Sequence, residues 1–278
     1  MPDWLPEFLN SNLLYGPFYQ IGSAIWNIVM TVCTGIMTTT PQGFSADTWE
    51  YVRTELYPWA LSIGVMSMDL FIMMGFFRAV GNFKENMTLE LMIEVLIKIV
   101  VLNVLMVSGL RIIEMLFKMA SAMAGTAVMI EPPSFFTGDV DVGSVIFYWL
   151  FGFLYFLVAL VCAFLILLTL YGRYIKLYTL VVTFPLAMPT ITGGRGVEGT
   201  AYAWMKSFLS NTFEIVIIAL AIAIAGRITA GVSVFTSNRD LLNMFDGFAQ
   251  ALNSMIYMIL MAVSVKGAPT FLNKTFNL

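Results

Sequence analysis

Long apolar runs, separated by isolated charges, divide most of this chain into segments of the length that a membrane-spanning helix needs. Crossing the hydrocarbon core of a bilayer takes about 20 mostly apolar helical residues. The strongest candidate lies between Asp141 and Arg173, where 31 residues carry no charge. We therefore predict an all-α, polytopic membrane bundle with about five transmembrane helices, at 57–77, 91–110, 144–171, 207–226 and 247–265.

The apolar segment 177–194 is harder to assign, because Pro185 and Pro189 each remove a backbone hydrogen bond from a helix. We expect a short, broken or re-entrant helix here rather than a sixth span. With five spans, eight basic residues, Arg173 among them, fall on one side of the membrane and five on the other. The positive-inside rule then predicts an extracytoplasmic N-terminus and a cytoplasmic C-terminus.

Residues 1–56 differ from the spans. Between Phe8 and Ala46 there is no charge, and polar residues interrupt apolar ones at roughly helical spacing. This pattern predicts an extracytoplasmic amphipathic region, with a surface or pore-lining helix rather than a span. Residues 57–278 are then the transmembrane bundle. After the second span, Glu114 and Lys118 lie one turn apart, which predicts that this helix continues beyond the bilayer.

Composition excludes several classes of protein. Of the 278 residues, 59% are hydrophobic and 11% are charged, whereas about a quarter of the residues in a soluble domain are charged. The 14 basic and 17 acidic residues give a net charge of -3, and the basic ones form no cluster that would bind duplex DNA. Histidine is absent and the two cysteines lie far apart, so we predict no metal site and no cofactor.

Charged residues inside spans are the first functional candidates, because an unpaired charge in the hydrocarbon core costs several kcal/mol. Asp69 and Lys98 fall at similar depths in neighbouring predicted spans, and Glu94 lies one turn from Lys98. These three residues form either a charge network that holds two helices together or part of a proton or ion pathway. Glu214 has no basic neighbour within one turn of its own helix, so it is protonated, paired across an interface, or exposed to a wet lumen.

Small residues mark a further candidate surface on the same predicted helix as Glu214. Ala219, Ala223 and Gly226 recur at three- and four-residue spacing, which permits close helix packing. The glycine-rich run from Gly193 to Thr200 lacks the lysine of a phosphate-binding loop, and no strand precedes it, so it predicts a turn. No nucleophile, acid–base pair or cofactor motif is recognisable, and we predict that the chain is not an enzyme.

Three segments carry a resemblance to a known family. They are the polar run Thr38–Ser45 before a span with an internal acid, the motif Gly-Arg-Tyr-Ile-Lys-Leu-Tyr at 172–178 before Pro185 and Pro189, and Trp204–Leu209 after the glycine turn. In these features the chain resembles the TrbL-like inner-membrane channel subunits of type IV secretion and conjugation systems, in the short form found on Gram-positive mobile elements.

The resemblance implies a non-enzymatic channel or scaffold subunit in the bacterial cytoplasmic membrane. Such a subunit would form a homo-oligomeric, pentamer-like ring at the base of the translocation stalk. Its partners would be a pilin-like stalk subunit, the secretion ATPases and other membrane subunits of the system. Single-stranded DNA with its bound relaxase would pass through transiently.

Two other functions remain open. A secondary transporter would use Asp69, Lys98 and Glu214 near the middle of the membrane, but it would also show a second broken helix in a matching repeat. A non-conducting anchor for a partner complex would need no lumen and would tolerate neutralisation of Glu214.

Overall fold

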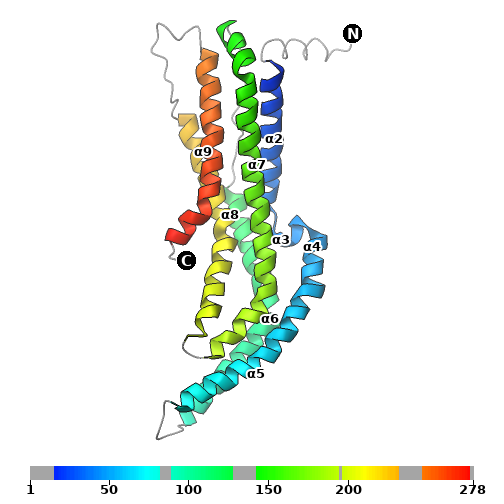
Figure 1. Ribbon diagram of the computed structural model, residues 1–278, viewed down its shortest axis with the longest axis vertical. Coiled ribbons are helices and arrows are strands. Elements are labelled where there is room, and N and C mark those ends of the chain that lie inside the picture. Colours follow the sequence, from blue (N-terminus) through cyan, green and yellow to red (C-terminus); the bar gives the residue numbers. More distant parts are fainter. Residues whose placement is uncertain (1–15, 82–88, 128–141, 194–195, 232–245, 276–278) are drawn as a thin grey trace. The chain divides into compact units, whose positions relative to one another are not determined.

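The computed structural model describes residues 16–81, 89–127, 142–193, 196–231 and 246–275, and these are almost entirely helical (Figure 1). No strand occurs within the described ranges, which confirms the prediction of an all-α, polytopic bundle. The elements in chain order are α2 (Pro17–Thr38), α3 (Pro41–Phe44), α4 (Ala46–Tyr51), the π-helical η1 (Val52–Leu56), α5 (Tyr57–Gly81), α6 (Leu89–Ala127), α7 (Val142–Ala187), the 3-10 helix η2 (Met188–Gly193), α8 (Gly199–Gly231) and α9 (Asp246–Thr275).

The chain divides into two compact units, and the division does not coincide with the predicted boundary at residue 57. Unit 1 comprises residues 1–38, 123–171 and 216–271, and unit 2 comprises 39–122, 172–215 and 272–278. The long helices α7 and α8 therefore contribute one segment to each unit. The units are formed by segments far apart in the chain, so they differ in kind from the predicted regions 1–56 and 57–278, which stay a prediction.

In unit 1, the buried stripe of α2 packs against α7 and α9. Tyr19 and Trp26 are almost completely buried and lie two turns apart on one face. The Tyr19 ring centroid lies 4.3 Å from that of Tyr155, and Trp26 meets the Tyr257 ring edge-on at 6.5 Å. Gly22 permits the close approach, since a Cβ there would lie 3.0 Å from a backbone atom of α7. The amphipathic pattern of this segment thus reflects a helix with one packed face.

In unit 2, glycines allow α5 to lie directly against the backbone that follows α7. A Cβ on Gly64 would overlap the carbonyl oxygen of Pro185, and one on Gly75 would overlap that of Thr192 in η2. The short helices before α5 are capped by side chains, with Ser45 accepting a hydrogen bond from the amide of Thr48 at 3.3 Å. Unit 2 therefore has a tightly fixed backbone path at both ends of α5.

Within the described residues, six helices are long and apolar enough to cross a membrane, compared with the five predicted spans. The additional one is α2, whose 22 residues reach spanning length although its sequence alternates polar and apolar positions. The expectation for 177–194 also needs correction. Residues up to Ala187 continue α7 without a break, Pro185 lies inside that helix, and the change to 3-10 geometry begins at Met188, just before Pro189.

The length of α7 has a direct physical consequence. Its 46 residues extend about 69 Å at 1.5 Å per residue. A hydrocarbon core of about 30 Å takes about 39 Å of helix even at a tilt of about 40°. About 30 Å of α7 therefore lies outside the hydrocarbon core. The predicted helical continuation of the second span through 111–125 agrees with α6, which is one helix of 39 residues, and its extension beyond the bilayer stays a prediction.

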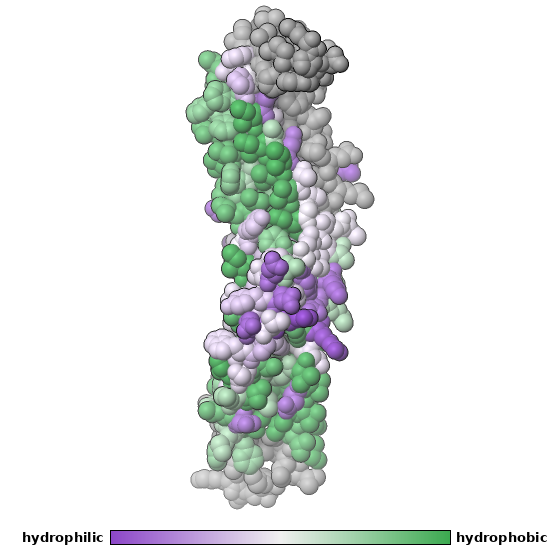
Figure 2. Space-filling model, turned by 90° about the vertical axis from the view of Figure 1, so that its right-hand side faces the viewer, coloured by the Kyte–Doolittle hydropathy of each residue, from purple (hydrophilic) through white to green (hydrophobic). Residues whose placement is uncertain are grey.

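Exposed apolar side chains cover large parts of the surface, and hydrophilic side chains gather in a limited zone (Figure 2). In unit 2, exposed charges gather on α4 and η1 and on one stretch of α6: Asp47, Glu50, Arg53, Glu55, Arg111 and Lys118. The exposed faces of α5 from Trp59 onward and of α6 up to Val107 are mainly apolar, and Asp69 and Lys98 are the exposed charges on them. This transition, with a tryptophan beside it, is typical of a membrane–water boundary.

Candidate functional site

A buried arginine lies at the centre of a polar layer in unit 2. The side chain of Arg173 on α7 is only 3% exposed. Its Nε donates a hydrogen bond to the carbonyl oxygen of Asn211 at 3.0 Å, and its Nη2 donates to that of Thr212, also at 3.0 Å. A carbonyl oxygen has two lone pairs, so both acceptors can keep their helical bonds as well. Arg173 thereby fixes α7 to α8 at one level.

Glu214 lies one turn further along α8 and is also only 3% exposed. It interacts electrostatically with Arg173 and with Lys176. No hydrogen bond to its carboxylate is found in the described part of the chain. The structure thus supplies a basic neighbour from another helix, which the sequence did not reveal. Within one subunit the carboxylate is enclosed by protein, so a lumen formed by this chain alone does not reach it.

Two tyrosines on α7 extend the layer toward the segment that follows α2. The hydroxyl of Tyr174 donates to the carbonyl oxygen of Thr39 at 2.9 Å, and that of Tyr178 donates to the carbonyl oxygen of Pro41 at 2.7 Å. Tyr174 also stacks on the ring of Phe44, with centroids 4.0 Å apart. These contacts hold residues 39–44 against one face of α7.

Additional side chains complete the layer. Ser121 on α6 donates to the same carbonyl of Thr39 at 3.3 Å, and Ser210 on α8 donates to Oδ1 of Asn273 on α9 at 2.7 Å. The hydroxyl of Thr212 is fully buried and has no hydrogen-bond partner among the described residues. The layer consists of donors and acceptors that join helices. Among the residues described, it contains no nucleophile placed next to a general base, and it suits the fixing of helices rather than chemistry.

Sequence reasoning missed this layer, although its residues lie in the quoted motif at 172–178. Arg173 was counted as a basic residue at the cytoplasmic side, whereas the structure buries its guanidinium. The available signal was spacing: Tyr174 and Tyr178 are one turn apart and therefore share a face of the helix. The acceptors, which are backbone carbonyls far away in the chain, leave no trace in a sequence pattern.

Of the predicted charge network, the structure describes the side chains of Asp69 and Lys98. Asp69 is exposed on α5, and none of the described residues forms an ion pair with it. Asp69 lies on a different face of α5 from Gly64 and Gly75, which form its packed side. Lys98 is exposed on α6, and the side chain of Glu94 lies outside the described residues. The structure therefore does not bring Asp69 and Lys98 together.

The small residues on α8 lie in unit 1 and serve packing. Ala219 is fully buried, whereas Ala223 and Gly226 are partly exposed. A Cβ on Gly226 would lie 4.0 Å from the hydroxyl of Tyr257 on α9, so this position faces that helix.

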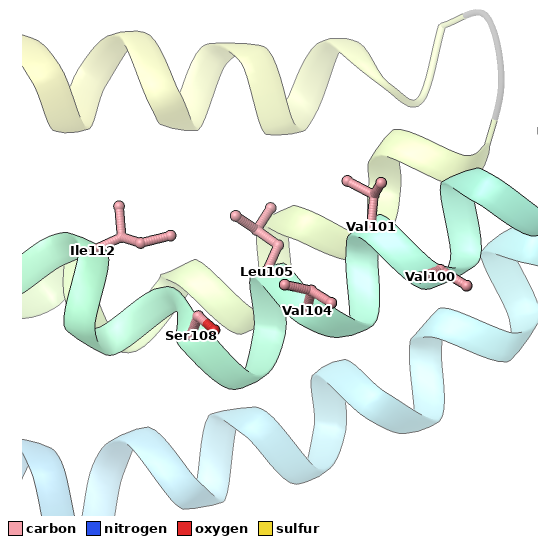
Figure 3. Close-up of a pocket in the computed structure, with 6 residues that line it drawn as sticks. All are labelled: Val100, Val101, Val104, Leu105, Ser108 and Ile112. Carbon is pink, nitrogen blue, oxygen red and sulfur yellow. The ribbon is translucent and has the colours of Figure 1, made fainter.

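An apolar cavity of about 260 Å³ lies along α6 in unit 2 (Figure 3). Its lining consists of five hydrocarbon side chains and the hydroxyl of Ser108, so it offers no charged group to a polar substrate. Among the described residues, no three His, Cys, Asp or Glu side chains come together as a metal site would require.

Comparison with known proteins adds no assignment: no family model, curated protein or solved structure matches this chain.

Proposed function

We propose that this chain is an integral membrane channel or scaffold subunit of a conjugative type IV secretion system. In this proposal it forms a homo-oligomeric, pentamer-like ring in the bacterial cytoplasmic membrane, at the base of the translocation stalk. In this proposal α5 to α9 make five crossings and α2 lines the passage on the extracytoplasmic side, so that the N-terminus lies outside and the C-terminus in the cytoplasm. The energy for transfer comes from the secretion ATPases, and the subunit itself performs no chemistry.

The observation that carries the proposal is the surface of α7. Its large exposed apolar side chains run from Trp149 to Ile175, about 40 Å along the axis. At the average tilt of about 20°, a hydrocarbon core of about 30 Å takes only about 32 Å of helix, and only a tilt near 40° would cover the whole apolar face with lipid. Large exposed apolar patches outside lipid indicate a protein contact. Neighbouring subunits, or the pilin-like stalk protein, would cover the part of α7 that lipid does not.

The outward face of α2 supports a role in lining a passage. Asn27 and Thr31 are exposed on it, and the helix contains no charged residue. A lumen that conducts single-stranded DNA with its relaxase must not hold a polyanion tightly, because phosphate contacts to basic groups dominate the affinity for nucleic acid. The same face also exposes Ile21, Ile28 and Val32, so it is an uncharged wall of mixed polar and apolar side chains, which meets that requirement.

The first experiment is to purify the full chain in mild detergent and image the particles by electron microscopy. We expect rings with an axial passage. A compact monomer or dimer with a closed interior would overturn the proposal and favour a transporter.

A second experiment tests the role of α2 during transfer. The native Cys33 and Cys162 are buried, so background labelling by a membrane-impermeant thiol reagent should be low. We expect labelling of Thr31→Cys to lower the frequency of DNA transfer at least tenfold. Met30→Cys, which replaces a buried neighbour on the same helix, is the matched control and should be unaffected by the reagent. Normal transfer by labelled Thr31→Cys would remove α2 from the passage.

A further inference from the structure

The apolar groove on α6 has the dimensions of a single hydrocarbon chain. Its lining residues run from Val100 to Ile112, about 18 Å along the helix axis. Val101 and Val104 are 59% and 60% exposed, so the groove opens at the surface. In Figure 3, the side chains of Val101, Leu105 and Ile112 point from α6 toward α8.

The volume of the groove favours a thin occupant. A cavity of about 260 Å³ along about 18 Å of helix is shallow and narrow beside an α-helix, which is about 10 Å across with its side chains. An extended chain of methylene groups is thinner than a helix and follows the line of the groove. The length of the groove is close to one leaflet of the hydrocarbon core, about 15 Å.

A pair of cations continues the line of the groove. Val104, Arg111 and Lys118 follow one another at seven-residue spacing, which places them on one line of α6, two turns apart. Arg111 and Lys118 are exposed, and neither forms an ion pair with a described residue. Glu114 lies between them on an adjacent line and is partly buried, so the three groups carry a net charge of +1. This positive end lies at the membrane–water boundary defined by Trp59 and Val107.

We infer that the groove is a binding site for an anionic phospholipid. One acyl chain lies along Val100 to Ile112, and the phosphate is held by Arg111 with support from Lys118. The inference needs only that unit 2 is in a bilayer, so it stands apart from the assignment to a secretion system.

The test uses the purified full chain, reconstituted in nanodiscs that contain equal amounts of phosphatidylglycerol and phosphatidylcholine with the same acyl chains. The lipid that remains bound after transfer to detergent is measured by native mass spectrometry. We expect phosphatidylglycerol to be retained in preference to phosphatidylcholine. Arg111→Gln should lower that preference about fivefold, as expected for one basic group at a membrane surface. Arg53→Gln removes another exposed cation and should leave the preference unchanged.

Filling the groove tests the acyl chain separately. Ser108→Leu and Val101→Phe should each reduce the retention of both lipids, whereas Val107→Leu, at an 84% exposed position outside the groove, should not. Two filling variants are used so that misfolding of one, detected by thermal unfolding, leaves the other. Three results would each overturn the inference. The native chain retains the two lipids equally, a folded filling variant retains as much lipid as the native chain, or the purified chain carries a second subunit in place of the lipid.

Discussion

Replacing Arg173 with methionine should destabilise the chain more than any other single change in the polar layer. The substitution keeps most of the buried volume but removes both hydrogen bonds to α8, and it takes from the Glu214 carboxylate the stronger of its two basic neighbours, leaving the exposed Lys176. Hydrogen bonds from a charged donor contribute about 1.5–3 kcal/mol each, and removing one partner of a buried charge pair costs about 3–5 kcal/mol. Because the two effects overlap, we expect Arg173→Met to lower the free energy of unfolding by about 3–5 kcal/mol.

Double substitution measures how much of that loss comes from the stranded charge. Glu214→Gln alone should cost about 1–2 kcal/mol, since Arg173 keeps both carbonyl acceptors. In Arg173→Met with Glu214→Gln no buried charge is left over, so the combined loss should fall short of the sum of the two single losses by about 1–3 kcal/mol. Lys176→Met is the matched control, because Lys176 is exposed on the same helix, and it should change stability by less than about 0.5 kcal/mol.

The assay is thermal unfolding of the detergent-solubilised protein, followed by tryptophan fluorescence. At about 2–4 °C per kcal/mol, Arg173→Met should lower Tm by on the order of 10 °C. If the loss of stability in the double variant equals the sum of the two single losses within about 0.5 kcal/mol, Arg173 and Glu214 do not interact. A Tm for Arg173→Met equal to that of Lys176→Met would refute the whole account of the layer.

Three further predictions use the same assay. Gly64→Ala should cost about 1–3 kcal/mol or more, because its Cβ would meet a backbone carbonyl, whereas Gly172→Ala, with open space around its Cβ, should be neutral or slightly stabilising; equal effects would refute the close contact of α5. Tyr178→Phe should cost about 1–2 kcal/mol and speed limited proteolysis within residues 39–45, and an unchanged cleavage rate would show that its hydroxyl does not hold this segment. Asp69→Ala and Lys98→Ala should have additive effects on stability within about 0.5 kcal/mol, and a larger coupling would restore the predicted charge network.

Hydropathy was sufficient to predict the helical bundle, because apolar runs of spanning length leave few other folds available. It was less successful at the ends of helices. Pro185 was expected to break a helix, but α7 runs through it and changes to 3-10 geometry at Met188. The sequence pattern of α2 was interpreted as a surface or pore-lining helix, since a helix with one packed face and one exposed face of mixed polarity looks the same whether or not it also crosses the bilayer.

The candidate site was predicted only in part, for a reason that Glu214 makes plain. Its burial in an apolar helix marked it as unusual, but its neighbour Arg173 is 41 positions away, and that arginine binds backbone carbonyls that any sequence could provide. Asp69 was predicted as a functional residue on the same grounds, but it lies exposed on α5. A charge inside a span therefore signals that something must solvate it, while its partner depends on tertiary packing that spacing along one helix does not encode.

Burial of Arg173 also changes the argument about orientation. A guanidinium bonded to α8 inside the bundle is not an interfacial anchor, so the count of eight basic residues against five becomes seven against five. The positive-inside rule acts through basic residues in short loops next to the ends of spans. The proposed orientation then depends mainly on Lys266 and Lys274, near the C-terminal end of α9, lying in the cytoplasm. Replacing both with glutamine, with a reporter fused to the C-terminus, should therefore weaken the orientation more than replacing Arg173.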